Sequence, residues 1–274
     1  MPAAAESGVS ARDTAGRLVS LPRLASRIEV IPPGAVELLF KIGRGGVIAS
    51  RGPDCDYPDE ALAIPVSSKP RDAGGYDLLV VDSLDEFPAG ARDGDRLKAF
   101  VYAPCDFRQL ADAAMALGVL TGAGNEGVRL GASITGAVSR VRAIIERIPS
   151  AKYPRVFWIA GVDPFETCGS RSFPGSMIAE AGGRNPFGDL EGSAPSVLLE
   201  DAIARAPQVV VLAALDLPAR GPGEERIIRI LSDTPAGTEG RVLRIDPELA
   251  AHPGPRSPGL LLILARAFHP DLIP

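Results

Sequence analysis

Residues 27–40, RIEVIPPGAVELLF, decide the fold of the first half of this chain. A short apolar stretch runs into Pro32-Pro33-Gly34, which has the composition of a turn, and then into apolar residues with helical spacing. Residues 155–165, RVFWIAGVDPF, open the second half in the same way, and a Gly/Ser-rich loop and a short helix at 174–182 follow them. The repeated pattern predicts two α/β lobes of similar plan.

The rest of the chain continues the alternation of apolar strands and amphipathic helices, which indicates mostly parallel sheets. The expected strands are 16–21, 27–31, 47–50, 78–81, 99–102, 155–160, 209–213 and 241–245. The expected helices are 35–42, 107–117, 174–182, 197–205, 224–232 and 257–268.

One longer helix is expected between the two lobes. Apolar residues recur at spacings of four and three along 125–148, which defines one helical face, at Ile134, Val138, Val141, Ile145 and Ile148. Such a helix is about 36 Å long. We therefore place an amino-terminal lobe at 13–122, a linking helix at 123–149 and a carboxyl-terminal lobe at 150–274. Ligands of open α/β sheets bind beyond the carboxyl ends of the strands, so we expect a binding cleft between the lobes.

Composition excludes several classes of function. The chain has 274 residues, 46% of them hydrophobic, a net charge of -5 and no basic run, which argues against a nucleic-acid surface. No apolar stretch approaches the roughly 20 residues of a membrane-spanning helix. The first residues have neither the basic nor the apolar part of an export signal, so we expect no signal or anchor within the given chain. We expect a monomer.

Two motifs that suggest enzymes have simpler interpretations. Gly122-x-Gly124-x-x-Gly127 matches a dinucleotide fingerprint formally, but a helix precedes it and Arg147 stands where an acidic residue belongs, so we predict a helix-to-helix loop. The chain has two histidines, His252 and His269, which leaves little material for a catalytic triad or a histidine metal cage.

The three cysteines each follow a predicted strand: Cys55, Cys105 and Cys168. This position is compatible with a soft-metal or redox site, and also with small buried hydrophobic residues, the commoner use of free cysteine. A bridge between Cys55 and Cys105 stays open at this point.

Several segments, in order, resemble one known family. In the first half they are 13–22, Arg27-Ile28, 36–43, Cys55-Asp56-Tyr57-Pro58 and 76–80; in the second half they are 181–187, 200–211, 253–259 and His269-Pro270. Together they resemble the cobalamin and iron-siderophore family of periplasmic substrate-binding proteins, over roughly residues 13–271.

The resemblance implies two Rossmann-like lobes with mostly parallel sheets, joined by one long backbone helix. It implies a non-enzymatic, periplasmic or extracytoplasmic protein that passes its ligand to an ABC permease. In this family a glutamate on each lobe docks onto the permease. Glu200 matches the carboxyl-lobe position, whereas the amino-lobe segment is shortened and contains no glutamate, which leaves Asp72 as a substitute.

The family pattern also places the ligand-binding residues. They are Pro33, Gly34, Asp54, Cys55, Tyr57, Cys105, Phe107, Phe165, Cys168, Arg171, Ser193 and Asp246. Trp158 falls in a core strand and not on a ligand face. With few basic residues in these loops, we expect a corrinoid, a cobalamin- or cobinamide-like metal chelate, with a ferric siderophore or haem as the alternative. No resident cofactor or protein-bound metal is expected. A metal- or tetrapyrrole-handling enzyme that uses the three cysteines is the other hypothesis.

Overall fold

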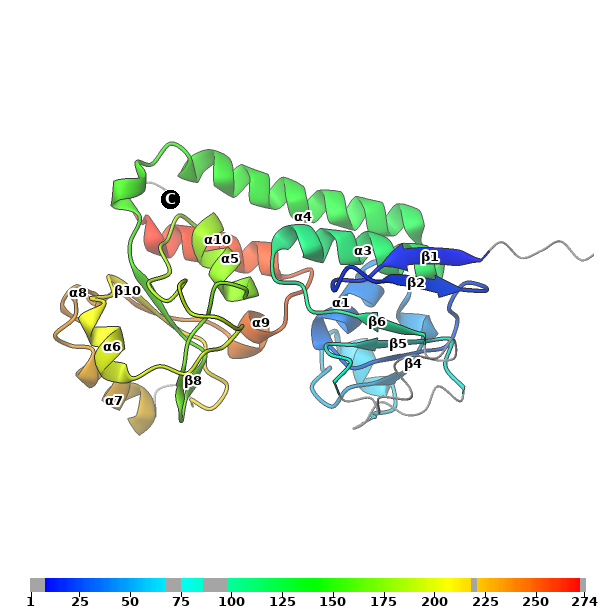
Figure 1. Cartoon of the computed structure of the whole chain (residues 1–274), viewed down its shortest axis with the longest axis horizontal. Helices are drawn as coiled ribbons and strands as arrows, with labels where there is room; N and C mark the ends of the chain where they lie inside the picture. Colours follow the sequence, from blue (N-terminus) through cyan, green and yellow to red (C-terminus); the bar gives the residue numbers. More distant parts are fainter. Residues whose placement is uncertain (1–7, 68–74, 86–97, 218–220, 272–274) are drawn as a thin grey trace, which may run out of the picture. The chain divides into compact units, whose positions relative to one another are not determined.

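The computed structural model describes residues 8–67, 75–85, 98–217 and 221–271, and the chain divides into two compact units, residues 1–135 and 136–274 (Figure 1). Each unit is built on its own parallel sheet, and helix α4, Gly124–Ile145, contains the point of division. The expected fold class, α/β with mostly parallel sheets, is confirmed.

The sheet of the first unit has the strand order β4-β3-β5-β6, and all of its pairs are parallel. Its strands are β3 Ile28–Val30, β4 Ile48–Arg51, β5 Leu78–Val81 and β6 Ala99–Val101. Every residue of β3, β5 and β6 is buried, as strands covered on both faces should be, and Glu29 of β3 is the one charged residue among them.

Helix α1, Pro33–Lys41, follows β3 directly. Proline in its first turn costs nothing there, because the amide that proline lacks would have no intrahelical partner. Gly43 follows the helix with a φ of +74°, a conformation that glycine adopts without strain. The short 3₁₀ turns Gly45–Val47 and Asp59–Ala63 flank β4.

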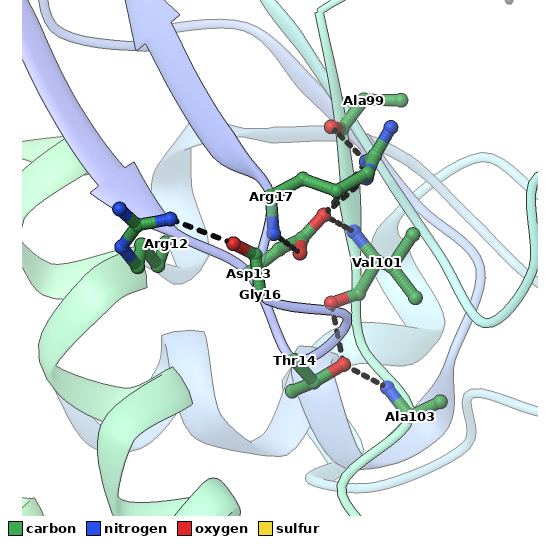
Figure 2. Close-up of polar contacts among 8 residues, drawn as sticks. All are labelled: Arg12, Asp13, Thr14, Gly16, Arg17, Ala99, Val101 and Ala103. Atoms are coloured by element: carbon green, nitrogen blue, oxygen red, sulfur yellow. Dashed lines mark hydrogen bonds and ion pairs between the residues drawn. The ribbon is translucent and has the colours of Figure 1, made fainter.

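A hairpin of β1, Val9–Arg12, and β2, Leu18–Leu21, packs beside helix α3, Phe107–Thr121. Figure 2 shows how its turn is fastened to β6: Asp13 accepts hydrogen bonds from the Arg17 amide (2.9 Å), the Arg17 guanidinium (2.7 and 2.9 Å) and the Val101 amide (3.2 Å). The Thr14 hydroxyl donates to the Val101 carbonyl and accepts from the Ala103 amide, both at 2.8 Å. The residues that begin the family resemblance therefore hold the hairpin in place.

Helices α3 and α4 approach each other closely after the turn at Gly122, whose φ is +80°. A Cβ added at Gly127 would lie 2.5 Å from the Ala114 carbonyl oxygen, and one at Gly118 would lie 2.7 Å from that of Ala123. Of the glycines that matched a dinucleotide fingerprint, Gly122 forms the expected helix-to-helix turn. Gly124 and Gly127 already lie inside α4, and Gly127 makes a close packing contact that was not predicted.

The sheet of the second unit has the parallel order β11-β10-β7. Its strands are β7 Val156–Ile159, β10 Val209–Leu212 and β11 Val242–Arg244. Its helices are α5 Phe173–Glu180, α6 Leu199–Ala204, α7 Pro222–Ile230, α8 Pro235–Thr238, α9 Pro247–Ala251 and α10 Ser257–Phe268. A small antiparallel pair, β8 Gly161–Val162 and β9 Phe165–Glu166, follows β7.

Phe187 anchors one side of the second core. Its buried ring packs against Phe157 at a centroid distance of 5.5 Å, and the Arg205 guanidinium lies 4.4 Å from the ring centroid. Asn185 fixes the approach to Phe187 by accepting from the Phe187 amide at 2.9 Å. This packing gives a structural reason for the second-half segments that resemble the family.

Most predicted elements are confirmed. The linking helix ends at Ile145 and not at residue 148, although all five apolar positions predicted for its buried face are buried. Strand β1, the β8–β9 pair and the short helices α8 and α9 were not predicted. Trp158 lies in β7 and is 1% exposed, as expected of a core residue.

Candidate ligand-binding loops

In the first unit, the predicted ligand-binding residues lie in the segments that follow β3, β4 and β6. Pro33 and Gly34 form the first turn of α1, where Pro33 is half-buried and Gly34 is buried. Asp54 and Tyr57 are exposed in the loop after β4, and 46% of Tyr57 is accessible. This loop therefore presents one aromatic ring and several carboxylates to solvent, among them Asp54 and Asp56.

Cys55 lies in the same loop but faces the interior. It is fully buried, and its thiol donates to the Ile31 carbonyl oxygen over 3.2 Å. Burial raises the pKa of Cys55 to about 12, so the side chain is a neutral thiol near pH 7. Its contact ties the loop after β4 to the end of β3.

Cys105 and Phe107 stand at the start of α3. Asp106 caps this helix by accepting from the Gln109 amide at 2.7 Å, and the Gln109 side chain accepts from the Cys105 amide at 3.0 Å. Cys105 is half-buried, whereas Phe107 is 4% exposed and packs into the core. The capping contacts fix the backbone of this loop.

In the second unit, three predicted residues lie between β7 and α5. Phe165 is half-buried in β9 and Arg171 is exposed, but Cys168 is 1% exposed. The carbonyl of Cys168 accepts from the Asn185 side chain at 2.8 Å, and burial raises the pKa of the Cys168 thiol to about 12. The buried Cys168 therefore helps to hold this loop in place through its contact with Asn185.

Two further predicted residues of this unit lie in exposed loops. Ser193 is exposed in the segment before α6. Asp246 is exposed at the end of β11 and caps α9 by accepting from the Glu248 amide at 3.0 Å. Ligand binding by the whole predicted set stays a prediction, because the structure describes each unit by itself.

The cysteines do not form the cluster that the enzyme hypothesis requires within the described part of the chain. All three are free, so the open question of a Cys55–Cys105 bridge is answered in the negative. Among the described residues no group of three or more metal-ligating side chains is found. Protonated, buried thiols at Cys55 and Cys168 are poor metal ligands and poor nucleophiles.

The sequence predicts two docking residues, Glu200 and Asp72. Glu200 is exposed in the first turn of α6, where an acidic side chain also complements the helix dipole. Asp72 lies outside the described residues.

Exposed apolar side chains were missed by the sequence analysis. Leu62 and Val66 lie in the segment that follows β4, with exposed fractions of 57% and 55%. Leu198 and Leu215 lie in the second unit, before α6 and after β10, with 68% and 56%. Single leucines in loops carry no sequence signal that separates exposed from buried positions, so only the structure reveals them.

These observations define a chain of two α/β units, each built on a parallel sheet, with exposed loops at the ends of the strands. The model of the periplasmic binding protein family matches residues 94–249, more than half of the sequence, and the chain belongs to this family.

Sequence identity to individual relatives is low. The chain is 23% identical over 202 residues to a vitamin B12-binding protein of Vibrio cholerae, covering 70% of this chain and 72% of the relative. A periplasmic heme binding protein from Pseudomonas aeruginosa has a similar fold, with 20% identity, a TM-score of 0.74 and coverage of 91% and 94% of the two chains. An ABC-type Fe3+-hydroxamate transport system structure from Saccharomonospora viridis has 18% identity, a TM-score of 0.74 and coverage of 95% and 98%. In the described residues, no helix is long and apolar enough to cross a bilayer.

Proposed function

We propose that this protein is the substrate-binding component of an ABC importer and that it captures a corrinoid outside the cytoplasmic membrane. The alignment with the vitamin B12-binding protein of Vibrio cholerae, over more than two thirds of both chains, is the observation that carries the proposal. Membership of the periplasmic binding protein family supports the proposed role, in which the protein binds and releases its ligand without altering it.

The one tryptophan of the chain is not available to a ligand. Trp158 is inside the core of the second unit, so it does not present its ring to a corrin face. Tyr57 and Phe165 are the accessible aromatic rings in the predicted loops, and Leu62, Leu198 and Leu215 add exposed apolar surface. Aromatic and apolar side chains of this kind suit contact with a flat macrocycle.

Haem or a ferric hydroxamate is the second candidate ligand class. The solved structures of a heme binding protein and of a hydroxamate transport component have the same fold at comparable TM-scores, which favours no single ligand. The enzyme hypothesis has weaker support, because burial raises the pKa of Cys55 and Cys168 far above neutrality.

Retention of a coloured ligand tests the proposal. The protein is incubated with cyanocobalamin, cobinamide, haemin and ferric hydroxamates, separated by gel filtration, and examined by its visible spectrum. We expect a stoichiometric corrin spectrum in the protein fraction. Retention of haemin alone would move the assignment to the second class, and retention of none of these chelates would overturn the proposed function.

A further inference from the structure

Acidic residues follow the strands of both parallel sheets. Six of the seven strands in these sheets are followed within five residues by an aspartate; the exception is β3, which runs into Pro32-Pro33-Gly34. The aspartates are Asp54 after β4, Asp82 after β5, Asp106 after β6, Asp163 after β7, Asp216 after β10 and Asp246 after β11. The same pattern therefore arises independently in each unit.

Local structure accounts for some of these aspartates. Asp106 and Asp246 cap helices, and Asp216 accepts from the Val162 amide at 3.0 Å. Asp54 and Asp163 are exposed and have no side-chain hydrogen bond or ion pair within the described residues, and the same is true of Asp56. Capping does not explain these three, and no cation within the described residues forms an ion pair with them.

Positive charge gathers at the opposite edge of the sheets. Arg27, Lys98, Arg155 and Arg241 directly precede β3, β6, β7 and β11. The guanidinium of Arg155 donates to the Ala206 carbonyl at 2.9 Å, and that of Arg241 donates to the last carbonyls of α10. Asp77 also precedes a strand, β5, but it is paired with Arg23 at 3.1 Å. Among the described residues, the starts of the strands are therefore more basic than their ends.

Few cations offset the acidic edges within the described residues. Arg51 is 6% exposed, and its guanidinium donates to the Gly52 and Pro53 carbonyls of its own loop. Arg108 lies 3.9 Å from Asp112 at the start of α3, and Arg171 is exposed. Around Arg51, residues 54–60 carry four carboxylates, at Asp54, Asp56, Asp59 and Glu60.

We propose that the ligand of this protein is a metal chelate with a net positive charge. This inference rests on the proposed function and on the expectation that the ligand binds beyond the carboxyl ends of the strands. A negative potential there attracts a cationic chelate, accelerates its association and disfavours ligands that carry free carboxylates or catecholates. The exposed Arg108 and Arg171 then act as local contacts and do not set the sign of the field.

Chelate pairs of nearly equal shape that differ by one positive charge test this inference. Aquocobalamin is compared with cyanocobalamin, and ferrioxamine B with its N-acetylated form; haemin, with two propionates, is the anionic probe. Dissociation constants are measured by titration at about 0.02 M and about 0.5 M NaCl. We expect the cationic member of a retained pair to bind about threefold or more tightly at low salt, with the ratio falling toward one at high salt.

Variants then identify the residues responsible. Asp54→Asn with Asp56→Asn in the first unit, and Asp163→Asn in the second, should each reduce the preference for the cation over its neutral twin by about two- to fivefold. Asp233→Asn is the matched control: it removes one exposed carboxylate from the turn after α7, on the way to the amino end of β11, and should leave the ratio unchanged.

The outcomes separate the two proposals. Binding of a neutral or anionic chelate as tightly as of its cationic counterpart, at low salt, overturns the charge inference and leaves the binding function intact. If the preference for the cationic over the neutral chelate falls equally in the Asp233→Asn control, the inference is also contradicted. The preference would then depend on the net charge of the protein and not on the position of the carboxylates. Failure of every chelate to bind overturns both.

Discussion

Asp13 shows how a single buried carboxylate organises a whole turn. Its side chain is fully buried and accepts hydrogen bonds from two backbone amides and from the Arg17 guanidinium. Arg17 in turn donates to the Ala99 carbonyl at 2.9 Å. The hairpin is thereby joined to β6 through one side chain, and the loss of that side chain leaves several buried donors without partners.

We expect Asp13→Ala to lower the free energy of unfolding by about 3 kcal/mol, because hydrogen bonds to a buried charged group are stronger than neutral ones and their donors become unsatisfied. Urea denaturation followed by circular dichroism measures the change. Arg12→Ala is the control, since Arg12 is exposed and, among the described residues, its side chain donates to the Gly16 carbonyl alone; we expect a change within about 0.5 kcal/mol. Equal losses in the two variants would contradict this role of Asp13.

At the scale of single residues, the sequence predicted which strand or loop a residue occupies better than how deeply its side chain is buried. It placed all three cysteines in loops after strands, and it placed Trp158 in a core strand. It could not distinguish the buried thiols of Cys55 and Cys168 from the half-buried Cys105, because burial is decided by contacts with Ile31 and Asn185, far away in the sequence.

Helices and strands were predicted most reliably where hydrophobic spacing was strong. Strand β5, Leu78–Val81, and helix α10, Ser257–Phe268, have the predicted bounds, since continuous apolar runs and periodic leucines leave little ambiguity. Strand β1 was missed because its residues are only alternately half-buried. Helices α8 and α9, of four and five residues, are too short for any periodicity to emerge.

Two glycines of α4 should respond in opposite directions to the same substitution. Gly127→Ala places a methyl group 2.5 Å from the Ala114 carbonyl oxygen, and backbone atoms must move to make room, so we expect a loss of about 1–3 kcal/mol in unfolding free energy. Gly136→Ala meets nothing closer than the end of the flexible Arg140 side chain at 3.7 Å, and should gain up to about 1 kcal/mol from helix propensity.

Thermal and urea unfolding of the two variants test this contrast in helix packing. A gain in stability for Gly127→Ala would show that α3 and α4 are not held at the close distance described above. A loss for Gly136→Ala would contradict the open surroundings of that position.

At the scale of the whole molecule, the sequence predicted both parallel sheets and the family. Repeated strand–turn–helix patterns carry this information, and the order of short motifs strengthens it. It could not predict the exposed leucines, or that Asp54 and Asp163 have no side-chain hydrogen bond or ion pair in the described part of the chain, because these features depend on how distant segments pack.

Glu200 provides a test of the proposed transport role. Because Glu200 is exposed on α6 and lies outside the predicted ligand loops, Glu200→Ala should leave chelate affinity within about twofold while weakening association with the partner permease about tenfold. Ligand titration and a binding assay with permease-containing vesicles measure the two effects separately. Glu239→Ala, another exposed carboxylate of the same unit, is the control. Equal loss of both activities in Glu200→Ala would refute a docking role.

The burial of two of the three free thiols has a consequence for biogenesis. In the oxidising compartment proposed for this chain, unpaired cysteines are exposed to disulfide-forming catalysts while the polypeptide is still unfolded. Once the loops after β4 and β9 have packed, the thiols of Cys55 and Cys168 are buried and uncharged, and of the three cysteines only Cys105 stays partly accessible to solvent. Productive maturation therefore depends on collapse of both units preceding thiol oxidation, and slow-folding variants should accumulate as wrongly crosslinked species.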